Sequence, residues 1–263
     1  MRNYYKLSMG KLIKVYGERN TNTNYMSKLL ELNLNVTEVP GTLPISIQRI
    51  LDRVVPYNEW LRDFYFKLSF ANNLGWKHSL VKPWSEIEKY SITKSNLFFL
   101  TISKNPYSWL LSLYRNPYHQ HYSKKPSFET FVCSPWKTVR RDNIRKVLSS
   151  PVELWNMKNR SYLQLDSRRA LNITTESIIE DPQGCIKKIG EKFCIEARSE
   201  HFIGYERSTK EASKDSNYYR DFYMLEWWRH DLSYKAIEAI NESVDQDLMA
   251  HFGYQVLPCP ERH

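Results

Sequence analysis

The sequence predicts an α/β protein in three layers, with a central parallel sheet flanked by helices on both faces. Three observations lead to this prediction. Residues 12–32 pass from a short β-forming run through a glycine into a helical pattern, as in the strand, turn and helix of an α/β unit. Residues 96–102 are an unbroken apolar run of strand length, as expected of a strand buried on both faces. The 263-residue chain is 41% hydrophobic and has no Gly/Pro/Ser-rich linker, so we expect residues 1–263 to form a single domain.

The first strand leads into a loop suited to binding an anion. Gly17 ends the apolar run, and Arg19 and the polar stretch 21–24 precede the helical pattern. A helix start after such a turn offers unpaired backbone N–H groups and the positive end of the helix dipole, which attract phosphate or sulfate. The other interpretation is an ordinary Asn/Thr-capped helix after a buried strand. A nucleotide triphosphatase loop fits poorly, because the Gly-Lys-Ser/Thr ending is absent.

Charge and composition narrow the class of partner. The formal net charge of +9 favours an anionic partner: a nucleotide, a sulfated or phosphorylated substrate, nucleic acid or a membrane surface. No apolar run is long enough to span a bilayer, and residues 1–6 lead into no apolar signal core, so we expect a soluble, cytoplasmic protein. The four cysteines lie far apart without a Cys-x-x-Cys pair, which predicts reduced thiols rather than a disulfide framework.

The remaining pattern predicts further strands and helices in order. Strands are expected at 36–39, 76–81 and 96–102, and residues 40–44 are expected to form a turn or loop. Helices are expected at 58–71, after Pro83, from Pro106, at 151–165 and at 182–193, followed by a polar, turn-rich stretch at 205–221 and a helical region that ends near residue 252. Because the carboxyl ends of parallel strands bind ligands in open sheets, the residues after strand 96–102 are candidates for a binding site.

Two other polar regions are open to more than one interpretation. Seven basic residues between 124 and 146 form a region that could meet an anionic substrate or be a solvated face. His119 and His121 flank Gln120 in a turn-prone segment, but no acidic or cysteine ligand is near them in the sequence. We therefore expect no metal site.

A family resemblance begins in the segment that follows strand 96–102. Lys104-Asn-Pro-Tyr followed by Ser112-x-Tyr114 resembles the Arg-Asp-Pro-x-x-x-x-x-Ser-x-Tyr element of sulfotransferases that use 3′-phosphoadenosine 5′-phosphosulfate. In that family the basic residue and the serine eight positions later hold the donor's 3′-phosphate, and Lys104 and Ser112 keep this spacing. Lysine replaces the usual arginine here, and Asn105 replaces the usual aspartate.

Two further blocks resemble the same family. The stretch Arg19-Asn-Thr-Asn-Thr-Asn-Tyr25 is similar to the Lys-Ala-Ala-Cys-Thr-Asn-Trp loop of carbohydrate sulfotransferases, which grips the 5′-phosphosulfate. Arg19 takes the place of the lysine in that register, whereas in the commoner Pro-Lys-Ser-Gly-Thr-Thr-Trp register the lysine falls on Asn20. Residues 170–182 look like the family's strand followed by Tyr-Glu-Asp-Leu-x-x-Asp-Pro. The resemblance implies a P-loop NTPase-like fold and these donor-binding residues: Arg19, Asn20, Thr21, Asn22, Thr23, Asn24, Tyr25, Lys104 and Ser112.

The resemblance also implies catalytic residues. The family carries its base in a Lys-x-His or Lys-Glu-x-His sequence on the second strand, which Lys77-His78-Ser79 resembles with the histidine one or two places early. His78 is thus the candidate base, beside Lys77, because a neutral histidine accepts a proton near neutral pH. Arg19 is expected to stabilise the leaving oxygen, and Glu18 is the reserve base. Strand alternation would point Lys77 and His78 to opposite faces.

One element of the family is missing. The Arg-Lys-Gly loop that usually completes the 3′-phosphate site near the C-terminus is absent, and Arg207, Lys210 or Lys214 are its candidate substitutes. The sequence therefore predicts a sulfotransferase with a nucleotide donor and a hydroxyl- or amine-bearing acceptor, on a carbohydrate or small molecule that can be anionic. A small-molecule or nucleoside kinase and a basic nucleic-acid-binding module remain the alternatives, although the eight-residue spacing and the anion loop disfavour nucleic acid as the partner.

Overall fold

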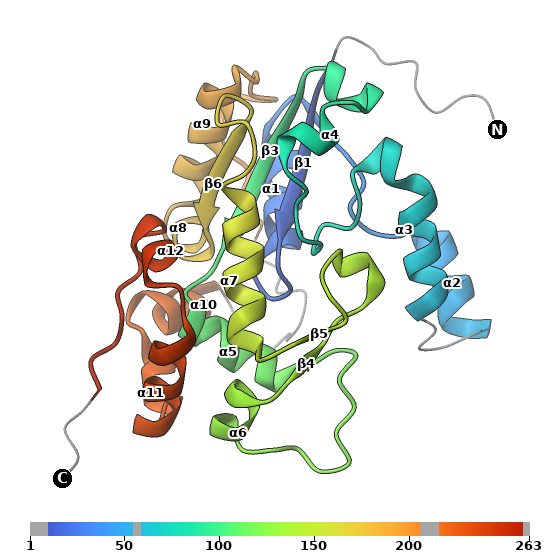
Figure 1. Ribbon diagram of the computed structural model, residues 1–263. Coiled ribbons are helices and arrows are strands. Elements are labelled where there is room, and N and C mark those ends of the chain that lie inside the picture. Colours follow the sequence, from blue (N-terminus) through green and yellow to red (C-terminus); the bar gives the residue numbers. More distant parts are fainter. Residues whose placement is uncertain (1–9, 55–58, 206–215, 260–263) are drawn as a thin grey trace.

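The computed structural model describes residues 10–54, 59–205 and 216–259. Within these residues, four parallel strands form one sheet in the order β2-β1-β3-β6. The strands are β1 (Lys11–Gly17), β2 (Val36–Glu38), β3 (Leu97–Ser103) and β6 (Ala170–Thr174). In Figure 1, α7 lies in front of this sheet and α1 behind it. The predicted three-layer α/β fold with a central parallel sheet is confirmed.

The other elements surround the sheet. The helices of the described part are α1 (Thr23–Asn33), α2 (Ile45–Val54), α3 (Glu59–Asn73), α4 (Trp84–Ile87), α5 (Pro106–Arg115), α6 (Phe128–Cys133), α7 (Pro151–Tyr162), α8 (Thr175–Glu180), α9 (Pro182–Phe193), α10 (Ser216–Met224), α11 (Tyr234–Ser243) and α12 (Gln246–His251). A short antiparallel pair, β4 (Trp136–Lys137) and β5 (Val147–Leu148), and the 3₁₀ helices η1 (Ser91–Lys94), η2 (Arg140–Asp142) and η3 (Trp227–Asp231) complete the described elements.

Each face of the sheet buries its own apolar layer. Successive side chains of a strand point to opposite faces, so Ile13 and Val15 pack with α1 and α9 on one side. Leu12 and Phe99 pack on the other side with Tyr162 at the end of α7. Because β1 and β3 are buried on both faces, β3 is almost continuously apolar and β1 is apolar at Leu12, Ile13, Val15 and Tyr16, and this is why both strands could be recognised from sequence.

A third apolar core lies beyond the carboxyl ends of the strands. It is formed mainly by α5, α6, α7, α11 and α12, and Figure 1 shows α5, α6 and α11 below the sheet. Trp109 of α5 and Trp155 of α7 are buried in it, 0% and 2% exposed. This core fixes α5 and α7 relative to the strand ends, and both helices carry side chains into the candidate site.

Three sequence expectations differ from the structure. Residues 76–81 were expected to be a strand, but Trp76 to Ser79 form a turn in which Ser79 N–H donates to the Trp76 carbonyl. Residues 45–54 form helix α2, which was not predicted; none of its side chains is buried, and Ile45, Ile50 and Val54 are exposed. Helix α10 begins at Ser216, inside the region expected to be polar and turn-rich. No helix in the described part of the chain is long and apolar enough to cross a membrane.

Candidate functional site

Two loops and the start of helix α8 meet at one edge of the sheet. In the parallel registers, Gly17 at the end of β1 lies beside Ile102 of β3, and Ser103 lies beside Thr174 at the end of β6. The loops that follow these strands therefore emerge side by side at the carboxyl edge, where open α/β sheets bind ligands. These loops contain two of the three blocks that suggested the family resemblance, and the third block forms β6 and α8.

The β1–α1 loop is tightly wound and leaves the start of α1 without a cap. A Cβ atom on Gly17 would lie 2.6 Å from Thr21 Oγ1 and 3.1 Å from the Ile102 carbonyl oxygen, so only glycine fits there. Asn20 and Asn22 have positive φ values of 67° and 60°, and Asn22, the N-cap residue, makes no side-chain capping hydrogen bond. The first-turn N–H groups, starting at Thr23, therefore lack the usual capping acceptor, and this arrangement suits an anion.

The other polar residues of this loop make contacts within the protein. Thr21 Oγ1 donates to the Glu18 carbonyl at 2.6 Å, so its hydroxyl stabilises the turn. Asn24 Oδ1 accepts from Lys77 Nζ, and Asn20 Oδ1 accepts from the hydroxyl of Tyr118. Tyr25 is half-buried, with its ring centroid 6.4 Å from that of Tyr205.

Arg19 lies at the centre of this loop with its charge enclosed. Its side chain is 5% exposed, and its guanidinium carbon lies 4.6 Å from the centre of the Trp76 ring and 5.0 Å from that of Tyr118. Nη1 is 3.2 Å from Glu18 Oε1, which also accepts from the Arg19 backbone N–H. Trp109 Nε1 donates to the Arg19 carbonyl at 2.9 Å. The guanidinium is thus held in one position by two aromatic rings and a carboxylate.

The turn at residues 76–79 brings both Lys77 and His78 to the β1–α1 loop. Lys77 Nζ donates to Asn24 Oδ1 at 2.5 Å, and His78 Nδ1 lies 2.5 Å from the Gly17 carbonyl oxygen. A strand would have placed the two side chains on opposite faces, but the turn does not alternate them. The backbone of Lys77 instead bridges two loops, because its N–H donates to Gly41 O and its carbonyl accepts from Gly17 N–H.

His78 is neutral and has one ring nitrogen available. Burial lowers its pKa well below 6.5, and the positive charges of Lys77, Arg19 and Lys158 lower it further against the hydrogen bond to Gly17. A carbonyl oxygen can only accept, so Nδ1 carries the proton and Nε2 is left as an acceptor. Nε2 has no hydrogen-bond partner among the described residues. A neutral imidazole with an open Nε2 is suited to take a proton.

Glu18, the reserve base, is held in ion pairs. It is 3% exposed, with Oε1 bonded to Arg19 and Oε2 lying 3.0 Å from Lys158 Nζ. The contact to Lys158 is an ion pair whose angles fall outside those of a hydrogen bond. With both oxygens opposite cations, this carboxylate balances charge inside the protein, whereas His78 keeps one ring nitrogen without a partner among the described residues.

Lys104 and Ser112 are brought together as their spacing predicts. Lys104 Nζ donates to Ser112 Oγ at 2.9 Å and to Tyr223 Oη at 2.7 Å, and it lies 4.4 Å from the centre of the Tyr223 ring. The side chain of Asn105 caps α5 by accepting from Tyr107 N–H, so the helix starts directly after the lysine. Tyr223 of α10 was missed from sequence, because nothing near it in the chain marks it as a partner of Lys104.

The third block supports the Lys104 loop from β6 and α8. Glu176 Oε1 accepts from the backbone N–H of Asn105 at 3.0 Å, and Oε2 accepts from the hydroxyl of Tyr254 at 2.9 Å. Burial raises the pKa of Glu176, against the hydrogen bonds and the charge of Lys104, which lower it. This carboxyl therefore ties the C-terminal segment to the loop that carries Lys104.

Several candidates fall outside this arrangement. Arg207, Lys210 and Lys214 lie outside the described residues. His119 Nε2 contacts the Lys137 carbonyl, and the described part of the chain has no group of three or more His, Cys, Asp or Glu side chains able to hold a metal. In the basic region 124–146, Arg141 is 7% exposed and pairs with Glu59 and Asp63, so this residue does not belong to a solvated face.

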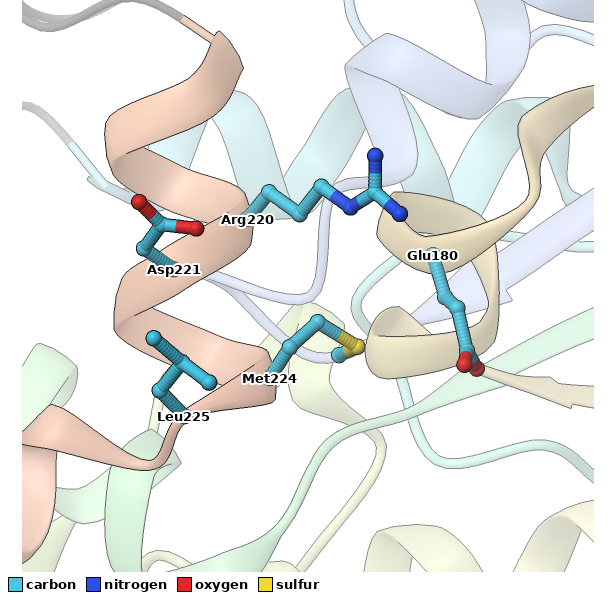
Figure 2. Close-up of a pocket in the computed structure, with 5 residues that line it drawn as sticks. All are labelled: Glu180, Arg220, Asp221, Met224 and Leu225. Atoms are coloured by element: carbon cyan, nitrogen blue, oxygen red, sulfur yellow. The ribbon is translucent and has the colours of Figure 1, made fainter.

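Two cavities lie near these elements without containing His78, Arg19 or Lys104 in their walls. Figure 2 shows the larger one, about 540 Å³, between α8 and α10, lined by Glu180, Arg220, Asp221, Met224 and Leu225. It adjoins the helix that supplies Tyr223. The second, about 450 Å³, lies between α1 and β2 and is lined in part by Asn24 and Glu38.

The comparisons with known proteins find structural neighbours only. No family model matches the sequence, and no curated protein matches it significantly. Among solved structures, the chain is similar to the sulfotransferase domain from the curacin biosynthetic pathway, with a TM-score of 0.48 and 11% identity, covering 94% of this chain and 99% of that one. It is also similar to the sulfotransferase domain from the Synechococcus PCC 7002 olefin synthase, with a TM-score of 0.44 and 13% identity, covering 94% and 95%. Similarity at this level does not establish a family.

Proposed function

We propose that this protein is a sulfotransferase that moves a sulfuryl group from 3′-phosphoadenosine 5′-phosphosulfate to a hydroxyl or amine of a carbohydrate or small molecule. One observation supports the proposal: two separate loops, each with a buried basic residue, Arg19 and Lys104, lie at the same edge of the sheet. Trp109 joins them, because it belongs to the helix after Lys104 and donates to the carbonyl of Arg19. A donor with a 3′-phosphate and a 5′-phosphosulfate has anionic groups to match both elements.

The chain's residues fit such a donor. The loop after β1 presents backbone N–H groups at an uncapped helix start, and the absence of a side chain on Gly17 lets the loop wind closely there. Lys104 and Ser112 offer an ammonium and a hydroxyl that already lie 2.9 Å apart. Together these groups would hold the 5′-phosphosulfate at α1 and the 3′-phosphate at the start of α5.

The bound donor supplies the activated sulfuryl group and a leaving group on which negative charge develops. In such loose, in-line transfers, positioning and electrostatic stabilisation provide most of the rate acceleration. Arg19 lies in the β1–α1 loop with its guanidinium fixed by Trp76, Tyr118 and Glu18, so its charge is preorganised beside the leaving oxygen. Lys77, bonded to Asn24 in the first turn of α1, adds a second cation next to the same loop.

His78 would act as the general base. Its Nδ1–H is oriented by the Gly17 carbonyl, so Nε2 can take the proton that the acceptor hydroxyl or amine loses on attack. The low pKa of His78 keeps the imidazole neutral at physiological pH, as a base must be. The base and the donor loop are held together through Gly17, which contacts both.

The test compares nucleotides by thermal shift and calorimetry. Adenosine 3′,5′-bisphosphate without added metal should raise the melting temperature, with a stabilisation of about 3 kcal/mol at a concentration of 100 times Kd. ATP with magnesium serves as the comparison for the kinase alternative. Stabilisation by magnesium-ATP and none by the bisphosphate would reject the sulfotransferase and favour the kinase.

A second comparison tests which residue reads the 3′-phosphate. Lys104→Ala should weaken binding of the bisphosphate by about 1.5–3 kcal/mol and leave binding of adenosine 5′-phosphate nearly unchanged, because only the bisphosphate has the group that Lys104 contacts. Lys188→Ala, which removes an exposed lysine of α9, is the matched control for the loss of one positive charge. If Lys104→Ala weakened the binding of both nucleotides equally, Lys104 would not recognise the 3′-phosphate.

A further inference from the structure

Lys158 is a buried cation in the middle of α7. Its side chain is 0% exposed, and it lies on the inward stripe of the helix with Trp155 and Tyr162. A lysine at such a position is unusual, because transferring an ammonium into the protein interior is costly unless the charge is paired. The contacts of Lys158 therefore indicate what its charge does.

Three segments from different parts of the chain meet at the Lys158 ammonium. Nζ lies 3.0 Å from Glu18 Oε2 in the β1–α1 loop and 3.1 Å from Asp142 Oδ1 in η2. It also donates to the main-chain carbonyl of His78. One ammonium thus holds the backbone of the candidate base, His78, and also the carboxylate of Glu18, which pairs with Arg19.

The charges in this cluster balance. Glu18 and Asp142 supply two carboxylates, and Lys158 and Arg19 supply two cations. Burial would raise the pKa of Asp142, but Lys158, Arg19 and the hydrogen bond from Val139 N–H lower it to about 2, so the carboxylate stays ionised. Removing Lys158 alone would leave an unbalanced buried negative charge, and the segments it connects would be free to move apart.

We propose that Lys158 is the positioning residue that fixes His78 relative to Arg19, so that the proton acceptor and the leaving-group cation keep one geometry. The identity of the reaction rests on the proposed function, but the role of Lys158 in placing His78 does not. Lys158 touches His78 only through the carbonyl oxygen, and its ammonium is fully occupied by protein groups. It acts through the base and not on the substrate.

The pKa of His78 depends on Lys158 and can be measured without a substrate. Lys77 lies beside His78, Arg19 and Glu18 face it from the β1–α1 loop, and Lys158 approaches it from α7. Of these, the positive charges of Lys77, Arg19 and Lys158 all lower the pKa of His78. Replacing Lys158 with methionine removes one of these charges and loosens the turn, so the pKa of His78 should rise towards its ordinary value.

The experiment follows the His78 ring resonances by NMR over a pH titration in four proteins. They are the wild type, Lys158→Met, Asp142→Asn and the double variant Lys158→Met/Asp142→Asn. The double variant restores the charge balance, so it can be used if Lys158→Met alone fails to fold. The pKa of His78 should rise in both variants that lack Lys158 and should not rise in Asp142→Asn, which disturbs the cluster but keeps the ammonium. An unchanged His78 pKa in a folded variant without Lys158 would overturn the proposal.

Kinetics provide the second readout once an acceptor has been found. A misplaced base should lower kcat by about 10²-fold and leave the affinity for adenosine 3′,5′-bisphosphate within a few-fold of wild type. A purely structural role would lower the amount of folded protein and leave kcat per folded molecule unchanged, and this result would also overturn the proposal. If the bisphosphate does not bind to the wild type, the proposed function fails, while the NMR titration still tests whether Lys158 sets the environment of His78.

Discussion

Two buried tryptophans each donate an indole N–H to the main-chain carbonyl of a basic residue in the candidate site. Trp155 Nε1 donates to the Lys104 carbonyl and Trp109 Nε1 donates to the Arg19 carbonyl, each at 2.9 Å. Replacing Trp155 with phenylalanine keeps an aromatic ring but removes the N–H donor. We predict that this single change both destabilises the fold and weakens recognition of the 3′-phosphate.

The expected loss has two parts. A buried carbonyl left without its donor costs about 1–3 kcal/mol. The smaller ring leaves a cavity in a site that is 2% exposed in the wild type, which costs about 1 kcal/mol more. The sum of about 2–4 kcal/mol corresponds to a melting temperature lower by about 5–15 °C for a chain of this size.

Trp136 provides a matched control. It is 1% exposed, and its Nε1 is buried without a hydrogen-bond partner among the described residues. Trp136→Phe therefore loses the same volume but no hydrogen bond, and its melting temperature should fall by less than that of Trp155→Phe. Equal losses in the two variants would show that the Trp155 N–H does not stabilise the Lys104 loop.

Nucleotide affinities distinguish the effects of replacing Trp155 and Trp109. Trp155→Phe moves the Lys104 loop, so in calorimetry it should weaken the binding of adenosine 3′,5′-bisphosphate more than the binding of adenosine 5′-phosphate. Trp109→Phe moves the Arg19 loop, which is expected to bind the 5′ group that both nucleotides share, so both should weaken alike. The opposite pattern would refute the assignment of Lys104 to the 3′ end and Arg19 to the 5′ end.

The remaining predictions concern pH. Lys14 is buried, and its Nζ donates to the carbonyls of Pro40 and Gly75. Burial lowers the pKa of Lys14 from 10.5 to about 7, so between these pH values the unfolded chain binds one proton more than the folded protein. Stability should therefore rise with pH across this window, by about 1 kcal/mol per pH unit from this group, and Lys14→Met should remove that slope in urea unfolding measured at several pH values. A variant with the wild-type slope would contradict the buried lysine as its source. For the base, turnover should fall only below pH 6.5, because His78 must be neutral and its pKa is lowered; His78→Ala should retain donor binding and lose about 10²–10⁴-fold in kcat. A folded His78→Ala with near wild-type turnover would exclude the histidine as the base.

The local parts of the site were predictable from the sequence. Lys104 and Ser112 are eight residues apart, and once the stretch after Pro106 is helical, this spacing puts them on the same side of the start of α5. The strands β1 and β3 were recognisable because both faces of each are buried, and parallel pairing then brought their loops to one edge. Residues 76–81 were predicted to be a strand carrying ionisable groups, but they do not form one. Their backbone groups pair instead with Gly41, with Asp142 and with Gly17 at the very end of β1, so no continuous strand pairing forms.

The sequence by itself predicted the strands β1, β2 and β3 and the helices α1, α3, α5, α7 and α9, and it placed the basic residues at the ends of two strands, because these features depend on residues within a few turns of one another. The tertiary structure alone decided the partners of those residues. Tyr223 reaches Lys104 across 119 residues, and Lys158 reaches His78 across 80. Such contacts depend on how α7 and α10 pack against the strand ends, and the apolar surfaces that direct this packing are non-directional, so no local pattern specifies which polar groups will meet.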